Sequence, residues 1–397
     1  MTLRFLIVFC LLLAPLLAGP GKVLTGIDVL ERDGFRGLSG QRIGLITNHT
    51  GLTRDGRSTI RALHDARNVE LVRIFSPEHG PQGQLDTAII GDGIEERTGI
   101  AIVSLYGEHR RPTAGMLSDL DTLVFDIQDI GTRFYTYIST MGNAMLAAAE
   151  HGKRFVVLDR PNPINGGAVA GPVIDDGRQS FVGFHTLPVR HGMTVGELAL
   201  MFRDELGLDL ELHVVPVEGW RRTDWFDATG LAWVDPSPNM RSLAAAILYP
   251  GIGPLETTNI SGGRGTATPF ELIGAPWLDA DALARDLQRL ELPGIEFAPV
   301  HFTPDASTYA NEDCHGVRFT LTDRDRFEPL ATGFAIAALL LRDYPTAWES
   351  GRYIRLVGNE AALETLLAGG SVADMETAWS AGLARFLERR AAYLLYD

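Results

Sequence analysis

Lysine is almost absent from this 397-residue sequence, which contains only Lys22 and Lys153, so nearly all of its positive charge comes from arginine. Acidic residues outnumber basic ones by 50 to 35, which gives a formal net charge of -15. No run of basic residues is present that could neutralise a phosphate backbone. We therefore expect neither nucleic acid nor an anionic membrane surface as a partner.

Cysteine is also scarce, and its scarcity excludes two kinds of site. With only Cys10 and Cys314, the chain has no disulfide framework and no zinc site built from cysteines. The histidines show no spacing typical of metal ligands, so we expect no metal ion and no other cofactor. The sequence also lacks the motifs of dinucleotide-binding proteins, P-loop proteins, zinc proteases and serine hydrolases.

One long apolar run is present, at the N-terminus. Arg4 precedes an unbroken apolar stretch over residues 5–13, which is followed by Pro15 and by small residues around Ala18. This order is typical of a secretory signal peptide over residues 1–21. A membrane-spanning helix needs about 20 apolar residues, and Pro15 cuts this run short. We therefore expect an exported protein, periplasmic or secreted, with no membrane attachment after cleavage.

Strand-like and helix-like segments alternate between residues 40 and 217. Several of the strands are continuous apolar runs, as in a sheet covered on both faces. The alternation predicts an α/β fold with a parallel, doubly wound sheet. We expect strands at 42–47, 69–76, 101–105, 121–127, 154–159 and 210–217, with helices at 57–66, 137–151 and 194–207.

The chain beyond Pro250 has a different character. Glycine-rich loops are mixed with predicted helices at 279–289, 330–342 and 374–393 and a strand at 316–321. We place a domain boundary near Pro250, which divides residues 22–250 from a smaller mixed domain over 251–397.

Polar residues cluster directly after the predicted strands. Asn48 follows the first strand, Glu78 and His79 follow the second, and Asp126 and Asp159 end two later ones. In an open parallel sheet the carboxyl ends of the strands share one edge, and ligands bind in the crevice outside it. Carboxylates, arginines, tyrosines and asparagines gathered there suit acid/base chemistry on a polyhydroxylated substrate, such as glycoside hydrolysis.

Several longer strings carry a resemblance to a known family. They are SPEHG (76–80), SLYG (104–107), FDIQDIGTRFYTYI (125–138), LDRPNP (158–163), LPVRHGMTVGEL (187–198), PSPNM (236–240) and PFELIGAP (269–276). In this order they resemble the exo-β-N-acetylmuramidase family, from about Gly26 to Tyr396. The resemblance implies a Rossmann-like domain followed by a smaller α/β domain, with the active cleft between them. It also implies release of N-acetylmuramic acid from the non-reducing ends of peptidoglycan fragments.

Glu78 is our first candidate for a catalytic residue. A carboxyl group held between a proline and the His-Gly pair at a strand end suits a general acid, and the family motif favours this interpretation over a turn residue. Asp126 and Asp159 are the candidates for a second carboxylate, although Asp159 and Arg160 equally suit a structural ion pair. A 2-acetamido sugar can also supply its own nucleophile, which would make a second carboxylate unnecessary. We expect Asp129 to bind its own backbone.

Muramic acid carries a lactyl carboxylate, which the planar fork of arginine matches with two hydrogen bonds. Arg133, Arg190 and Arg264 lie in motif loops and are candidates, although pairing with acidic residues accounts for at least one of them. The other predicted substrate contacts are Asn48, His79, Tyr135, Tyr137, Asn162, His191, Asn239 and Asn259.

Three further observations qualify this hypothesis. Ala170 stands before Gly171-Pro172, where the family often has an acidic residue, so a non-catalytic cell-wall sugar-binding protein is the alternative. Glu197 completes a capping box with Thr194, which favours a structural role. We expect Cys314 to be a buried free thiol. The sequence predicts no oligomeric state.

Overall fold

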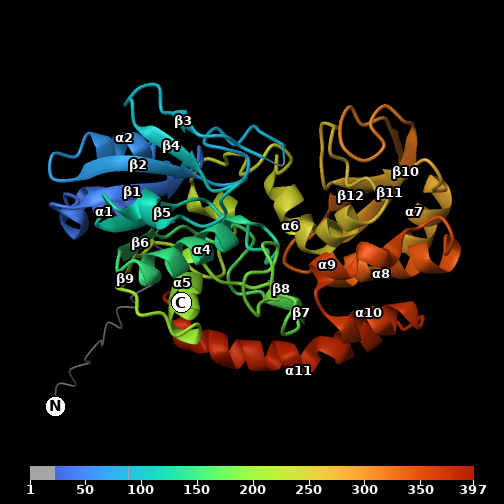
Figure 1. Ribbon diagram of the computed structural model, residues 1–397. Helices are drawn as coiled ribbons and strands as arrows, with labels where there is room; N and C mark the ends of the chain where they lie inside the picture. The colour runs from blue at the N-terminus through green and yellow to red at the C-terminus, as the bar shows by residue number, and fades with distance from the viewer. Residues whose placement is uncertain (1–22, 88) are drawn as a thin grey trace, which may run out of the picture.

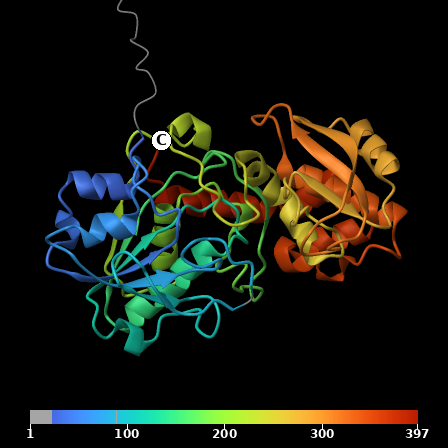
Figure 2. The same cartoon turned by 90° about the horizontal axis from the view of Figure 1, so that it is seen from above.

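The computed structural model describes residues 23–87 and 89–397, and it shows a larger and a smaller half side by side (Figure 1). The predicted signal peptide lies outside the described residues. The view from above shows the same two halves, joined by the chain around residue 250 and by a long helix that crosses from one to the other (Figure 2). Of the described residues, the larger half contains those from 23 to about 242.

The larger half is built on a seven-stranded sheet in the order β3-β4-β2-β1-β5-β6-β9. All neighbours pair in parallel except β3, which is an antiparallel edge strand. Numbered along the chain, the parallel strands follow the order 3-2-1-4-5-6, which confirms the predicted Rossmann-like arrangement. The strands are β1 (Arg42–Thr47), β2 (Glu70–Ser76), β3 (Gly93–Ile94), β4 (Ala101–Ser104), β5 (Thr122–Asp126), β6 (Arg154–Leu158) and β9 (Leu212–Val215).

Helices cover both faces of this sheet, which explains the continuous apolar strands. On one face, α1 (Gly26–Arg32) and α2 (Thr59–His64) pack with Ile43 and Leu45 of β1. On the other, α4 (Tyr137–Glu150) and α5 (Val195–Glu205) pack with Phe125 and Phe155. The short helix α3 (Ala114–Leu117) precedes β5. The central strands β1, β5 and β6 therefore bury side chains of both orientations.

The smaller half contains a three-stranded antiparallel sheet and several helices. The strands β10 (Leu272–Ala275), β11 (Ile295–Phe302) and β12 (Cys314–Leu321) lie in the order β10-β12-β11. Cys314 is a buried free thiol, as predicted. Pro250, our expected boundary, lies inside a helix. The helices are α6 (Leu243–Ile252), α7 (Ala280–Arg289), α8 (Pro329–Asp343), α9 (Ile354–Val357) and α10 (Glu360–Leu367).

The last part of the chain returns to the larger half. Helix α11 (Val372–Arg390) runs beneath both halves in Figure 1 and packs against β7 (Ala170–Val173), which pairs with β8 (Pro188–Arg190). The chain beyond residue 250 therefore belongs to both halves in space.

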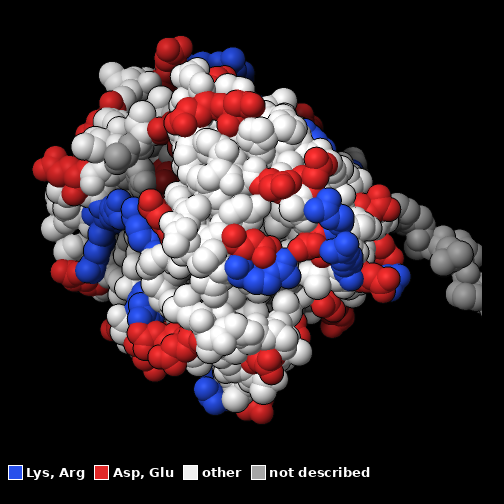
Figure 3. All heavy atoms as spheres, turned by 90° about the vertical axis from the view of Figure 1, so that its right-hand side faces the viewer, with Lys and Arg blue, Asp and Glu red and all other residues white. Residues whose placement is uncertain are grey.

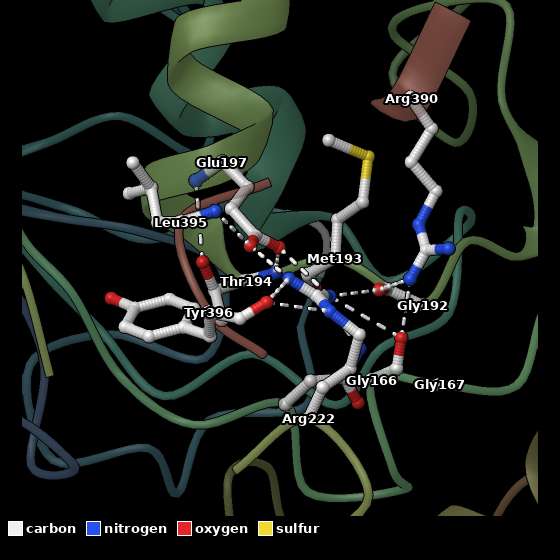
Figure 4. A network of polar contacts seen from close by, with 12 residues as sticks. Gly166, Gly167, Gly192, Met193, Thr194, Glu197, Arg222, Arg390, Leu395 and Tyr396 are labelled. Atoms are coloured by element: carbon white, nitrogen blue, oxygen red, sulfur yellow. Dashed lines mark hydrogen bonds and ion pairs between the residues drawn. The ribbon is translucent and has the colours of Figure 1, made fainter. Parts of the chain in front are cut away.

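A buried ion pair holds the end of the chain against the larger half (Figure 4). Arg222 pairs with Glu197, and the Leu395 amide donates to the same carboxylate at 2.8 Å. Arg390 of α11 donates to the Gly192 carbonyl at 2.7 Å. Glu197 also closes the predicted capping box at the start of α5, so its structural role is confirmed. One glutamate thus joins the helix start to the end of the chain.

Acidic and basic side chains are interspersed on the face of the smaller half that Figure 3 presents. In residues 23–87 and 89–397, no helix combines the length and the apolar character needed to span a bilayer.

Candidate active site

Glu78 lies at the junction of two adjoining cavities between the halves. The larger cavity has a volume of about 620 Å³ and the smaller about 170 Å³. Both are lined by Glu78, Thr136, Val182 and Arg355. Glu78 is the carboxylate that both cavities share, so a ligand spanning them would pass it.

The lining residues of the larger half come from the ends of neighbouring strands. Glu78 follows β2, Tyr106 follows β4, and Thr136 is the N-cap residue of α4, which follows β5. These are carboxyl ends of parallel strands, where the crevice of such a sheet is expected. The smaller half contributes Tyr249 of α6 and Arg355 of α9. The site is therefore assembled from both halves.

The polar contacts of Glu78 involve two hydroxyl groups. The Thr136 hydroxyl donates to Oε2 of Glu78. Burial and the Glu78 carboxylate together raise the pKa of Tyr106 to about 12, so this phenol stays protonated at neutral pH. The Glu78 side chain is half-buried, and it opens into both cavities. It is thus held in place and still accessible.

Aromatic rings form much of the smaller cavity. Tyr135 and Tyr137 meet edge to face, with ring centroids 5.0 Å apart, and Tyr249 packs on Phe270 at 4.6 Å. The Tyr137 hydroxyl donates to the Pro236 carbonyl. Burial raises the pKa of both Tyr135 and Tyr137, so neither phenol ionises at neutral pH. The structure brings both predicted tyrosines to the cavity that Glu78 lines.

Arg264 lines the same cavity and lies between two acidic residues. It pairs with Glu256, and its Nη1 is 3.4 Å from Oδ2 of Asp86. The Glu256 carboxylate raises the pKa of Arg264. Asn239 donates to Asp86 at 3.0 Å, and Tyr249 donates to Glu256 at 3.1 Å. Arg264 is thus engaged by carboxylates of the chain, which is the alternative that we expected for at least one of the arginines.

His79 shapes the loop that follows Glu78. Its backbone is left-handed, with φ of 68°, and its Nδ1 lies 2.8 Å from the Leu85 carbonyl. The ring also lines the smaller cavity. Its placement thus suits the predicted contact with a substrate, and its contact with Leu85 also holds the loop.

Three arginines line the larger cavity. Arg178 pairs with Glu360, whereas Arg110 lies over the Phe181 ring, with its guanidinium carbon 4.5 Å from the centroid. The third is Arg355. Among the described residues, no ion pair engages Arg110 or Arg355. The larger cavity therefore presents two exposed guanidinium groups beside Glu78.

Asp126 and Asp159 do not face these cavities, contrary to our expectation. Both side chains are fully buried. Asp126 receives two hydrogen bonds from Arg160, of 2.6 and 3.0 Å, and a third from a threonine hydroxyl. Asp159 accepts from Thr194 at 2.7 Å and from Gly196 at 2.8 Å, and burial raises its pKa to about 6. Their partners lie inside the protein, because the loops beyond β5 and β6 fold over these strand ends.

Arg133 and Arg190 are also buried, where we expected them to meet a substrate carboxylate. Arg133 donates to backbone carbonyls of both halves, including Leu187 at 3.0 Å and Val357 at 2.9 Å. Arg190 donates to a backbone carbonyl and lies over the Trp225 ring. Burial lowers the pKa of Arg133 to about 9 and that of Arg190 to about 10. Loop carbonyls occupy the positions that a ligand would need.

Four other predicted contacts hold loops together and lie outside the two cavities. Asn48 accepts from the Thr50 amide at 2.9 Å, and Asn162 donates to the Met193 carbonyl at 3.0 Å. Asn259 donates to a backbone carbonyl at 2.7 Å. His191 is fully buried, and burial lowers its pKa to about 3.

Asp129 binds its own backbone as predicted, through a 2.6 Å hydrogen bond from the Gly131 amide. Its burial raises the pKa of this carboxyl group to about 7. Nε2 of His191 lies 3.8 Å from Oδ2 of Asp129. This pair is structural in position, since both side chains are buried.

Ala170 lines another cavity, of about 840 Å³, which shares no lining residue with the two at Glu78. Ala170, where the sequence departs from the family pattern, is therefore not among the residues that line the cavities at Glu78.

The sequence did not point to four charged residues that line the cavities, namely Arg110, Arg178, Arg355 and Glu256. Tyr106 and Thr136 lie within quoted motif strings, so their position after a strand could have identified them. Glu256 follows a helix and Arg355 belongs to a short one, and neither is near a predicted strand end. They reach the site because the smaller half folds against the larger one.

The two carboxylates of the site are engaged by a hydroxyl and by an arginine, which does not suit a metal pair. Within the described residues, one group of three side chains could hold a metal ion, and it lies on β11, β12 and the preceding loop.

Comparison with known proteins identifies the family. The family model described as "Exo-beta-N-acetylmuramidase NamZ, N-terminal" matches residues 43–244, and the corresponding C-terminal model matches residues 247–396. This chain belongs to the NamZ family. NamZ proteins are glycoside hydrolases, and this chain is therefore an enzyme of that class. A curated relative, "Peptidoglycan beta-N-acetylmuramidase NamZ" of Bacillus subtilis (strain 168), is 43% identical over 379 residues, which cover 94% of this chain and 92% of the relative.

Two crystal structures of proteins from Bacteroides fragilis NCTC 9343, both described as DUF1343 family proteins, share the NamZ fold. One has a TM-score of 0.88 and 39% identity, and covers 95% of this chain and 99% of its own. The other has a TM-score of 0.78 and 31% identity, with 94% and 99% covered. The resemblance stated from the motif strings is thereby confirmed.

Proposed function

We propose that this NamZ-family enzyme releases N-acetylmuramic acid from the non-reducing ends of peptidoglycan fragments, with Glu78 as the general acid/base. The observation that carries the proposal is the position of Glu78, a carboxylate that lines both cavities. In glycoside hydrolysis a carboxylic acid protonates the leaving oxygen as an oxocarbenium-like transition state forms. A saccharide that spans the two cavities would present its linking oxygen to Glu78.

The surroundings of Glu78 support an acid/base role. The Thr136 hydroxyl fixes the carboxyl group through Oε2, and the side chain still opens into both cavities. The buried rings of Tyr135 and Tyr137 exclude water on one side. Glu256 is the other carboxylate of the smaller cavity, but it is committed to Arg264 and Tyr249. It is therefore a weaker candidate for proton transfer.

Arg110 and Arg355 are the proposed partners of the lactyl carboxylate. This group distinguishes muramic acid from glucosamine, and a guanidinium matches it with two parallel hydrogen bonds. Both arginines lie in the same cavity as Glu78 without an acidic partner among the described residues. We propose them for this role in place of Arg133 and Arg190, whose guanidinium groups bind backbone carbonyls.

The direct test is hydrolysis of a muramyl-glucosamine disaccharide. We expect free N-acetylmuramic acid and N-acetylglucosamine in equal amounts, and little turnover of di-N-acetylglucosamine, which lacks the lactyl group. Folded protein that binds the disaccharide without cleaving it would instead indicate a sugar-binding protein. Following the anomer of the product over time would separate retention from inversion.

We also propose that the chain is exported, on the basis of Arg4, the apolar stretch and Pro15 near its N-terminus. N-terminal sequencing of protein recovered outside the cytoplasm should begin near residues 19–22. Recovery only of the uncleaved chain from the cytoplasm would contradict export.

A further inference from the structure

Two histidines and an aspartate lie together at one end of the small sheet, away from the cavities at Glu78. His301 of β11 stands directly opposite His315 of β12, and their ring centroids are 4.4 Å apart. Asp313 is two residues before His315, and its Oδ2 lies 3.7 Å from Nε2 of that histidine. Residues i and i+2 of an extended chain point to the same side, so all three side chains share one face.

From this arrangement, we propose that His301, Asp313 and His315 bind a zinc ion. One ligand atom from each lies within 4.8 Å of the other two. Atoms bound to one tetrahedral zinc are about 3–3.5 Å apart, given bonds of about 2 Å. Because Asp313 and His301 are exposed, small rotations of their side chains bring the three atoms to that spacing.

The donor set decides the class of metal. Two imidazoles and one carboxylate suit zinc and its neighbours in the first transition row, whereas magnesium and calcium prefer oxygen ligands. Zinc has no geometric preference from its d electrons, so it accepts the positions that the two strands impose. Three protein ligands leave a fourth position for water.

The place of the site in the fold indicates a structural role. His301 precedes the loop 303–313 and Asp313 ends it, so an ion would tie the two ends of this loop together. The loop contacts the segment that carries Arg264, since the Asp305 amide donates to the Gly265 carbonyl at 2.9 Å and the Tyr309 hydroxyl donates to the Asn259 carbonyl at 2.9 Å. None of the three ligands lines a cavity at Glu78.

The test uses the untagged protein after removal of metals with EDTA. Calorimetric titration with zinc should show one ion per chain, zinc should raise the Tm, and cobalt should give the visible absorption of a tetrahedral complex. Magnesium should produce no shift. His301→Gln and His315→Gln should each weaken zinc binding about tenfold or more, and Asp313→Asn should weaken it less.

His213→Gln is the matched control, because His213 is an exposed histidine on β9 of the other sheet. This variant should bind zinc as the parent does. Equal Tm values in EDTA would show that all variants are folded. The proposal is overturned if the parent shows no saturable zinc binding, or if the double variant His301→Gln/His315→Gln binds zinc as tightly as the parent. Either result leaves the proposed hydrolase activity untouched.

Discussion

Two groups of carboxylates follow the strands of the large sheet, and they differ in what covers them. Glu78 follows β2, near the edge of the sheet, where it opens into the cavities. Asp126 and Asp159 end β5 and follow β6, where loops close over them and supply Arg160 and Thr194 as partners. All three have the same position in a strand-by-strand description. Only the packing of later segments separates the accessible carboxylate of Glu78 from the buried carboxylates of Asp126 and Asp159.

The comparison also explains the arginines. Arg133 lies in a motif string and is buried among carbonyls, whereas Arg355 lies in no recognised string and faces the cavity. A residue can therefore belong to a family motif because the fold requires it, as Arg133 does, and not because it contacts a substrate. The following variants test this division.

The largest effect should follow from Glu78→Gln. Glutamine keeps the shape and an acceptor for Thr136 but cannot donate a proton as an acid, so kcat should fall by about 10²–10⁴-fold while substrate is still bound. Steady-state kinetics and a binding assay would measure both. Glu256→Gln is the comparator, and its smaller loss should follow from the release of Arg264. Equal losses in the two variants would leave Glu78 without a special role.

Asp126→Ala should lower the free energy of unfolding strongly and change kcat little. The variant leaves Arg160 buried without its carboxylate, and breaking a buried ion pair costs about 3–5 kcal/mol. Urea denaturation would measure the loss, and kcat per folded molecule should change little. A kcat that collapses while the free energy of unfolding is unchanged would return Asp126 to the list of catalytic residues.

Asp129→Asn should stabilise the protein, and more so at high pH. Because burial raises the pKa of Asp129 from 3.8 to about 7, the folded state resists an ionisation that the unfolded chain undergoes freely. The resulting cost is absent below pH 4, grows between pH 4 and 7 and is complete above that. At about 1.4 kcal/mol per pKa unit it is on the order of 1–4 kcal/mol.

Denaturation of both proteins at pH 4 and pH 8 would test this expectation. The advantage of Asp129→Asn should be larger at pH 8, while an exposed control, Asp281→Asn, should show no such trend. An advantage that is equal at the two pH values would mean that Asp129 ionises normally in the folded protein.

The smallest effect concerns substrate choice. Arg355→Gln should raise KM for the muramyl disaccharide about tenfold, because a rim guanidinium contributes roughly 1.4 kcal/mol to binding a carboxylate. The kcat should be nearly unchanged. Arg178→Gln is the matched control, since Arg178 lines the same cavity but is paired with Glu360. A larger rise in KM for Arg178→Gln than for Arg355→Gln would place the binding site of the lactyl carboxylate nearer α10.

The parallel strands of the large sheet were predictable because local apolar runs mark them, whereas the short edge strand β3 was not predicted. The apolar run at 42–47 coincides with β1, and the segment at 154–159 differs from β6 by one residue. Strand β11 was missed because it is mostly exposed and contains Pro299, so no apolar run or clean alternation marks it. Pro250, which we placed at the domain boundary, is accommodated inside α6 and does not end that helix.

The site was predictable only in part, for a physical reason. Glu78 lies just beyond β2, and Tyr135 and Tyr137 lie where the segment after β5 enters α4, so the order of the strands brings these residues to one edge of the sheet. Arg355 and Glu256 reach the cavity through the docking of the smaller half, and no local pattern encodes that docking. The exposure of a polar side chain depends on contacts with distant segments, so Asp126 and Glu78 could not be distinguished in advance.

The four backbone carbonyls that accept from Arg133 have a consequence for how the two halves can move. This side chain joins Pro172 and Leu187 in one half to Leu356 and Val357 in the other, next to the wall that carries Arg355. A hinge that opened the two halves would have to strip a buried cation of its acceptors. These four hydrogen bonds therefore oppose a hinge motion that would separate the two walls of the cavity.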